Sequence, residues 1–147
     1  MRYADILLWA AECEAEVGTP DKAREYVNLV RQRAADPSTW VKTAGGANAA
    51  NYKIGLYTAT WTDPVLAKKA VHFERTLELA MEGVRFFDMV RWGVADVEIN
   101  AYFAKEKSLR SYMKTAVFTK GKNEYFPLPQ DEIDRVGGGL LKQNPGY

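Results

Sequence analysis

The sequence predicts a mainly α-helical fold that consists of a tetratricopeptide-like helix hairpin, further helices and an irregular C-terminal tail. Apolar residues recur at helical spacing over residues 1–35 and 63–113, and a proline stands at the expected start of two helices. After residue 113, glycine and proline become frequent and the helical period is lost. The length of 147 residues suits a single domain, and 47% hydrophobic and 27% charged residues are typical of globular proteins.

Residues 1–35 are expected to form the hairpin. Over residues 3–17 the apolar side chains lie on one face of a helix, and Gly18 provides a stop. Thr19 then occupies an N-cap position, with Pro20 at the first helical position, so a second, antiparallel helix should follow. Such a hairpin cannot bury both of its faces alone, and the sequence holds no second copy of it. We therefore expect the chain to be a piece of a longer protein.

Residues 36–62 form a long connection without a clear period, which is typical of a functional loop, an insertion or an ordered irregular segment. Its aromatic rings could stack on the C–H faces of sugars, and Asn48, Asn51 and Lys53 could orient such a ligand. The apolar–polar alternation around Ile54 instead favours packing on the core. Both roles stay open, with core packing favoured, for the four aromatic candidates Trp40, Tyr52, Tyr57 and Trp61.

Residues 63–113 are expected to hold the remaining helices. An Asp-Pro pair repeats the cap-and-proline signal and predicts a third helix over residues 65–81. Gly83 predicts a kink or a phase shift, after which the helical pattern continues over residues 84–92. Apolar spacing predicts a fourth helix over residues 94–113.

Residues 114–147 are expected to form an extended tail. Aromatic and proline residues dominate its first part, and a short helical turn should surround Ile133. The three consecutive glycines at 137–139 then allow the backbone a wide range of conformations. The Asn-Pro-Gly sequence at 144–146 predicts a type II turn just before the last residue.

One charged constellation stands out in the helical stretch that begins with the third predicted helix and continues past it. Arg75, Glu78, Glu82 and Arg85 follow at spacings of three, four and three, which places them on one side of a helix. We favour a structural ion-pair ladder that also fixes neighbouring loops. The alternative is that Glu78 and Glu82 act as paired carboxylates for acid–base chemistry or a di-metal site. A di-metal bundle needs Glu-x-x-His pairs, and the sequence contains none.

The residues needed for most enzyme chemistry are scarce. His72 is the single histidine and Cys13 the single cysteine, so neither a zinc site nor a Cys–His pair is expected. The sequence has no Gly-x-Ser-x-Gly and no phosphate-binding loop. We therefore expect no catalytic residues, no bound metal, no cofactor and no enzymatic activity. A net charge of +1 with interspersed signs also argues against nucleic acid as a partner.

Three blocks of sequence occur in a fixed order. The first block consists of residues 2–8 together with residues 30–34. The second block is the stretch 74–93, which contains the motifs ELAMEG, RFFD and RWG. The third joins FPLPQDEI at 126–133 to QNPGY at 143–147. Together these blocks resemble the C-terminal portion of SusD/RagB-type nutrient-binding lipoproteins. The second block departs from the family pattern at Met81, where an aromatic is usual, and at residues 89–90.

The resemblance implies a non-catalytic protein on the outer face of the outer membrane. It would capture oligosaccharides, or in some cases peptides, together with a SusC-like TonB-dependent transporter. Contact with the membrane would be only through a lipid anchor that this chain lacks, and the chain itself would be soluble. The charged stretch would be a scaffold element. Two alternatives stay open, namely a tetratricopeptide-like module for protein–protein interaction and a hydrolase that uses Glu78 and Glu82.

Overall fold

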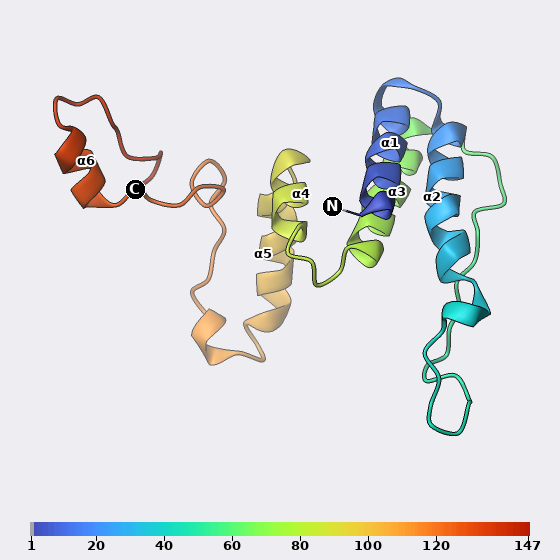
Figure 1. The fold of residues 1–147 in the computed structure, drawn as a ribbon. Helices are drawn as coiled ribbons and strands as arrows, with labels where there is room; N and C mark the ends of the chain where they lie inside the picture. The colour runs from blue at the N-terminus through green and yellow to red at the C-terminus, as the bar shows by residue number, and fades with distance from the viewer. Residues whose placement is uncertain (1) are drawn as a thin grey trace. The chain divides into compact units, whose positions relative to one another are not determined.

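The computed structural model describes residues 2–147 and shows a mainly α-helical chain, so the predicted fold class is confirmed (Figure 1). Six α-helices and two short 3-10 helices occur in this range, and its β structure is limited to one isolated bridge between Lys42 and Asn48. The chain divides into two compact units, of which the first ends at Gly83 and the second is Val84–Tyr147. No helix within residues 2–147 is long and apolar enough to span a bilayer.

The first unit begins with the predicted hairpin, formed by α1 (Tyr3–Val17) and α2 (Pro20–Ala34). Pro20 occupies the first turn of α2, where its missing N–H costs no helical hydrogen bond. Thr19 stands at the N-cap position, but its hydroxyl makes no capping hydrogen bond. Glu14 secures the connection instead, because its Oε2 accepts a hydrogen bond from the Thr19 backbone N–H at 3.0 Å.

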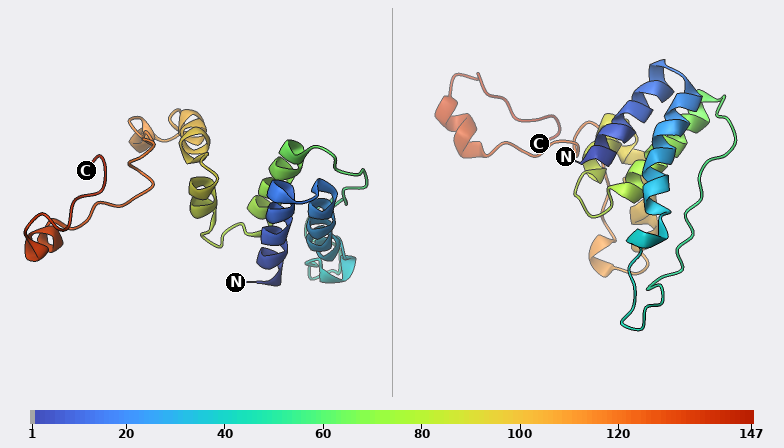
Figure 2. Two further views of the ribbon diagram at one scale, coloured as in Figure 1. Left: turned by 90° about the horizontal axis from the view of Figure 1, so that it is seen from above. Right: turned by 45° about the vertical axis from the view of Figure 1, so that its right-hand side comes forward.

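The third helix, α3 (Pro64–Glu78), packs against both helices of the hairpin (Figures 1 and 2). Asp63 caps α3, since its Oδ1 accepts hydrogen bonds from the backbone N–H groups of Val65 and Leu66. Full burial of one Leu or Val side chain stabilises such a core by about 1.5–3 kcal/mol. The buried side chains between the three helices are small or medium-sized: Ala4, Leu7, Leu8, Ala11, Ala15, Ala23, Val27, Val30, Ala67 and Val71.

The third helix ends earlier than the sequence predicts. α3 stops at Glu78 rather than at residue 81, and residues 79–83 form a turn in which Met81 has a φ of 67° and Gly83 a φ of 76°. A non-glycine residue with positive φ cannot continue a right-handed helix. The expected kink near Gly83 is therefore a complete break, and the division between the two units falls at this point.

The second unit contains shorter helices and a long irregular tail. Its elements are α4 (Arg85–Arg91), α5 (Ala95–Glu106), a 3-10 helix at Ser111–Met113 and α6 (Gln130–Val136). The predicted fourth helix is thus too long, because α5 ends at Glu106. The predicted type II turn is confirmed, since the Tyr147 N–H donates to the Asn144 carbonyl at 3.2 Å and Gly146 has a φ of 84°.

Extended parts of the second unit are held by single side-chain amides. Asn100 of α5 donates to the carbonyl of Phe118 and accepts from its N–H, both at 2.9 Å. Gln143 accepts from the N–H of Leu128 at 2.7 Å and donates to its carbonyl at 2.9 Å. Each amide supplies the donor and acceptor that a neighbouring β-strand would otherwise provide.

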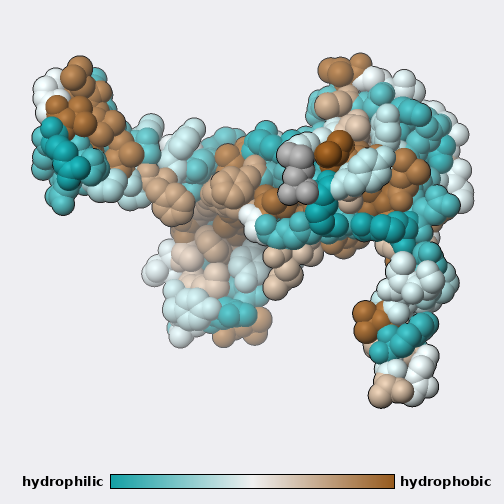
Figure 3. Space-filling view, viewed as in Figure 1, coloured by the Kyte–Doolittle hydropathy of each residue, from teal (hydrophilic) through white to brown (hydrophobic). Residues whose placement is uncertain are grey.

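Hydrophobic side chains also reach the surface of both units, as the brown areas of Figure 3 show. Ile6 and Leu29 are exposed on the hairpin, and Phe87 and Phe126 on the second unit. Apolar atoms make up much of the surface of any folded protein, so scattered residues of this kind do not by themselves define a binding site.

Candidate functional site

The aromatic segment, residues 36–62, lies antiparallel to α2 and is bound to it through the backbone of the segment. Near the start of α2, Asp21 accepts a hydrogen bond from the Trp61 N–H at 3.0 Å. Nearly three turns later, Arg31 donates to the carbonyl of Gly55 at 2.5 Å. The irregular segment is therefore attached at several points along one helix.

Asn28 makes the central attachment of this segment. Its side-chain amide donates to the Tyr57 carbonyl and accepts from the Tyr57 N–H, both at 2.9 Å. Arg24 donates to the same carbonyl at 3.1 Å. Together with Asp21 and Arg31 these residues form a polar stripe on one face of α2, at spacings of three, four and three. The sequence contains this stripe, but its partner could not be recognised because the contacts are made with backbone atoms.

Tyr57 and Trp61 form an edge-to-face pair, with ring centroids 5.0 Å apart and planes inclined by 68°. Both rings pack against the core of the three helices. The guanidinium of Arg31 lies 4.9 Å from the Tyr57 ring centroid, within range of a cation–π contact. The pair also borders a pocket of about 310 Å³ that Thr60 and Thr62 help to line. These two of the four aromatic candidates therefore contribute to the core.

Trp40 and Tyr52 form a second pair, with centroids 4.8 Å apart and planes inclined by 22°, which is a stacked geometry. The indole Nε1 of Trp40 donates a hydrogen bond to the carbonyl of Ala34 at 2.9 Å, which fixes the ring at the end of α2. Both rings are half-buried, and the core cluster found in residues 2–147 includes neither. The structure thus brings the four candidates together as two pairs, one in the core and one nearer the surface.

A short loop connects the two stacked residues and projects into solvent, at the lower right of Figure 1. The Ala49 N–H donates to the Val41 carbonyl at 2.9 Å, and the Thr43 N–H donates to the Ala47 carbonyl at 2.8 Å. Residues 41–51 are all exposed. The stacked pair therefore stands at the base of an exposed loop, where a ligand can reach it.

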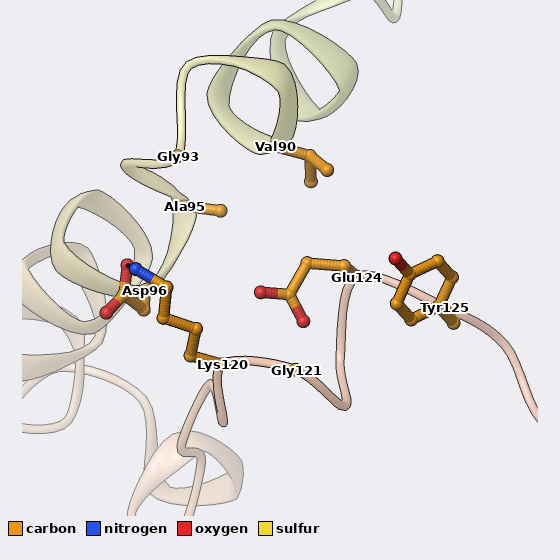
Figure 4. A pocket seen from close by; sticks show the side chains of 8 residues that line it. All are labelled: Val90, Gly93, Ala95, Asp96, Lys120, Gly121, Glu124 and Tyr125. Carbon is orange, nitrogen blue, oxygen red and sulfur yellow. Dashed lines mark ion pairs between the residues drawn. The ribbon is translucent and has the colours of Figure 1, made fainter. Parts of the chain in front are cut away.

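A pocket of about 270 Å³ lies within the second unit, between the end of α4, the start of α5 and residues 120–125 (Figure 4). The Glu124 carboxylate points into it, and its buried Oε2 has no hydrogen-bond partner among residues 2–147. Lys120 Nζ lies 3.9 Å from Asp96 Oδ1. None of the site residues predicted from sequence lines this pocket.

In the described part of the chain, no three His, Cys, Asp or Glu side chains are grouped closely enough to hold a metal ion.

Arg75 and Glu78, two members of the predicted ion-pair ladder, connect α3 to the hairpin. Arg75 is 2% exposed, and its Nη1 lies 2.9 Å from Asp5 Oδ1 of α1. Glu78 Oε1 lies 2.7 Å from Nη1 of Arg2, just before α1, and 2.6 Å from Nη2 of Arg33 on α2. A single carboxylate oxygen therefore bridges both ends of the hairpin.

Glu82 and Arg85, the other two members, lie beyond the end of α3. Both carboxylate oxygens of Glu82 accept hydrogen bonds from the Arg2 guanidinium, at 2.5 and 3.2 Å. Arg2 also donates to the backbone carbonyl of Glu78 at 2.8 Å. Arg85 belongs to the second unit, where its Nη2 lies 3.5 Å from Glu98 Oε2. Because the helix breaks at residues 79–83, the four charged residues do not share one helical face.

Glu74 belongs to the same set of contacts, although the sequence did not single it out as a site residue. It is 5% exposed, and its Oε2 accepts a hydrogen bond from Arg31 Nη1 at 2.6 Å. Consecutive helical residues point about 100° apart, so Glu74 can face α2 while its neighbour Arg75 faces α1. The adjacent Glu-Arg pair therefore fixes α3 against both helices. The sequence did contain a signal for this role, because Glu74 and Arg75 follow the apolar buried positions Ala67 and Val71 of the same helix.

Comparison with known proteins identifies the family. The sequence profile of the SusD family matches residues 1–147. The chain belongs to the SusD family. SusD-like protein P25 of Formosa agariphila is 36% identical over 154 aligned positions, which cover 99% of this chain and 24% of that protein. SusD-like protein P2 of the same organism is 30% identical over 148 positions, which cover 100% and 25%. The chain spans about a quarter of the length of these relatives.

SusD-family membership confirms the resemblance found in the sequence. Proteins of the SusD family are non-catalytic binding proteins, which agrees with the expectation that this protein is not an enzyme. In this SusD-family chain, the stretch from Glu74 to Glu82 supplies the charged groups that hold α3 and the turn after it to the hairpin.

Arg2 and Glu82 stabilise each other's charged forms. Hydrogen bonds to Glu82 and then to Glu78 raise the pKa of the Arg2 guanidinium. The hydrogen bond from Arg2 lowers the pKa of the Glu82 carboxyl below its ordinary value of 4.5. A carboxyl whose folded-state pKa is lowered contributes stability above its unfolded pKa, and this contribution is lost as the pH falls through the folded-state pKa.

We therefore expect the replacement Glu82→Gln to reduce the acid sensitivity of the first unit of this SusD-family chain. The urea midpoint of the wild type should fall as the pH drops below 4.5, and the midpoint of the variant should fall less. Urea titrations at a series of pH values measure this difference. Glu25→Gln serves as the control, because Glu25 is exposed and pairs only with the exposed Lys22 among the described residues. Equal acid dependence in the two variants would contradict the assignment.

Asn28→Ala should loosen the aromatic segment and destabilise the first unit by about 2 kcal/mol, because the Tyr57 N–H loses its hydrogen-bond partner. Hydrogen exchange at the Tyr57 amide should accelerate, and urea unfolding gives the free energy. Gln32→Ala, one turn later and exposed on the same helix, should change neither measurement. Protection of Tyr57 that survives in Asn28→Ala would show that the segment is held elsewhere.

Proposed function

We propose that the protein is the glycan-binding component of an outer-membrane nutrient-uptake system and captures oligosaccharides without chemical change. Its membership of the SusD family supports this role. In the same proposal it acts at the cell surface with a SusC-like TonB-dependent transporter and is attached to the membrane by a lipid anchor. Because the chain spans about a quarter of the length of its relatives, these functions are proposed for the whole protein.

The stacked pair of Trp40 and Tyr52 is the observation that supports sugar binding by this part of the protein. Flat aromatic faces bind the apolar C–H surfaces of sugar rings. The hydrogen bond from the Trp40 indole to Ala34 holds the ring in place before a ligand arrives, which lowers the entropic cost of binding. We assign ligand contact to this pair. The helices α1, α2 and α3 then act as the scaffold that carries the aromatic segment.

Calorimetric titration of the whole protein with a panel of oligosaccharides tests this proposal. Trp40→Ala should weaken binding by about tenfold or more, because it removes the stacking surface. Tyr102→Ala, which removes an exposed ring from α5, is the matched control and should bind like the wild type. Circular dichroism verifies that both variants fold. Unchanged binding by Trp40→Ala would contradict the assigned site, and no binding to any sugar would contradict the function.

A further inference from the structure

Beyond Asp36, the aromatic segment carries only positive charge. Up to Thr62 it contains Lys42 and Lys53 but no acidic residue, although the whole chain has 19 acidic residues among 147. The two carboxylates that border the segment, Asp36 and Asp63, each cap the N-terminus of the helix that follows them. Asp36 and Asp63 each accept a hydrogen bond from a backbone N–H that follows them, at 2.9 and 2.8 Å. The segment therefore provides cations without a nearby carboxylate in the sequence to neutralise them.

Lys42 lies beside the stacked pair. Its Nζ is 6.0 Å from the Trp40 ring centroid, and the β-bridge to Asn48 fixes its backbone. The ammonium group donates one hydrogen bond to Asn48 Oδ1, so two of its three N–H donors remain. Lys53 directly follows Tyr52 and is exposed. Within residues 2–147, neither lysine forms an ion pair.

The other aromatic pair has a cation beside it that is already engaged. Arg31 lies over the Tyr57 ring, but its Nη1 binds Glu74 at 2.6 Å and its Nε binds the Gly55 carbonyl at 2.5 Å. A ligand at Tyr57 would therefore meet a neutralised guanidinium. At Trp40 it would meet an ammonium group that has no carboxylate partner in the described chain.

We propose that this site selects anionic glycans, those that carry carboxylate or sulfate groups, over neutral ones. The inference rests on the proposed glycan-binding function. A sugar ring stacked on the aromatic pair would place its acidic substituent within reach of Lys42, with Lys53 adding a second positive charge. Charge-assisted hydrogen bonds are about twice as strong as neutral ones. Because these ammonium groups are exposed, the selectivity decreases as the salt concentration rises.

Calorimetry with matched pairs of oligosaccharides tests the inference on the whole protein. β-1,4-linked mannose and mannuronate tetramers, and α-1,4-linked galactose and galacturonate tetramers, differ within each pair only in the C6 hydroxymethyl or carboxylate group. At least one acidic tetramer should bind about tenfold more tightly than its neutral counterpart at low salt. This advantage should shrink as the salt concentration increases to about 0.5 M.

The double variant Lys42→Gln/Lys53→Gln should lose the preference for the acidic tetramer, while the double replacement by arginine should retain it. Lys69→Gln is the matched control, since Lys69 is an exposed lysine on α3. Equal affinity for acidic and neutral tetramers, or an acidic preference that survives in the double glutamine variant, overturns the inference. If neutral sugars bind equally well and Trp40→Ala weakens them, the glycan-binding function stands and only the charge selection fails. No binding to either acidic tetramer overturns the inference, and no binding to any sugar of the wider panel overturns the glycan-binding function as well.

Discussion

Replacing Arg75 by methionine should destabilise the first unit by about 3–5 kcal/mol, because it leaves the Asp5 carboxylate without the partner that compensates its partial burial. Arg75 is 2% exposed and lies 2.9 Å from Asp5, and its guanidinium is 5.8 Å from the ring centroid of Trp9. Methionine keeps much of the apolar length of the side chain, so the loss reports mainly on the charge. Urea unfolding followed by circular dichroism measures the effect.

The control for this replacement is Lys69→Met on the exposed side of α3, which should change the free energy of unfolding by less than about 0.5 kcal/mol. Adding Asp5→Asn to Arg75→Met should recover part of the lost stability, since the Asp5 charge that Arg75 neutralises is then removed as well. If Arg75→Met is as stable as Lys69→Met, the contact between α3 and α1 does not depend on this ion pair.

Glu74→Gln should cost about 3 kcal/mol, because the Arg31 guanidinium would lose the carboxylate that neutralises it. Arg31 also donates to the Gly55 carbonyl and lies over the Tyr57 ring. The variant should therefore show a second effect, namely faster hydrogen exchange in the aromatic segment around Tyr57. Urea unfolding and residue-resolved hydrogen exchange measure the two effects separately.

The exposed ion pair between Glu16 and Lys68 provides the comparison for this variant. Its atoms are 2.7 Å apart and it likewise connects α3 to a helix of the hairpin, in this case α1, but its partners are 46% and 37% exposed. Glu16→Gln should therefore cost no more than about 1 kcal/mol. A similar cost for Glu74→Gln and Glu16→Gln would mean that burial of the Glu74 pair adds nothing to its contribution.

Features governed by local sequence were predicted well. The bounds of the hairpin helices and the start of α3 follow from proline at the first helical position, from the Asp63 cap and from apolar spacing. The final turn likewise follows from its Asn-Pro-Gly sequence. The end of α3 was missed, because methionine gives no sequence signal for the left-handed conformation that Met81 adopts.

Contacts between distant segments were predicted less well. The four aromatic candidates and the four charged residues were selected by type and spacing, and neither property reveals a partner. The partners of Glu78, for example, come from residues 2 and 33, which meet only after the hairpin has folded. The core pair is held in place by the contacts that Asn28 and Arg31 make with the backbone of the aromatic segment, and the spacing of these residues on α2 does not reveal that partner.

Three side-chain amides, those of Asn28, Asn100 and Gln143, each hold an extended stretch of chain by both backbone groups of one residue. Each of these contacts is local, and in the aromatic segment it acts together with the bonds of Asp21, Arg24 and Arg31. A stretch therefore opens only when all of its attachments break, and the helices then stay intact. Local openings of this kind have small free energies compared with global unfolding. The molecule can therefore remodel its non-helical surface piece by piece, each piece with its own opening rate, while the helical framework persists.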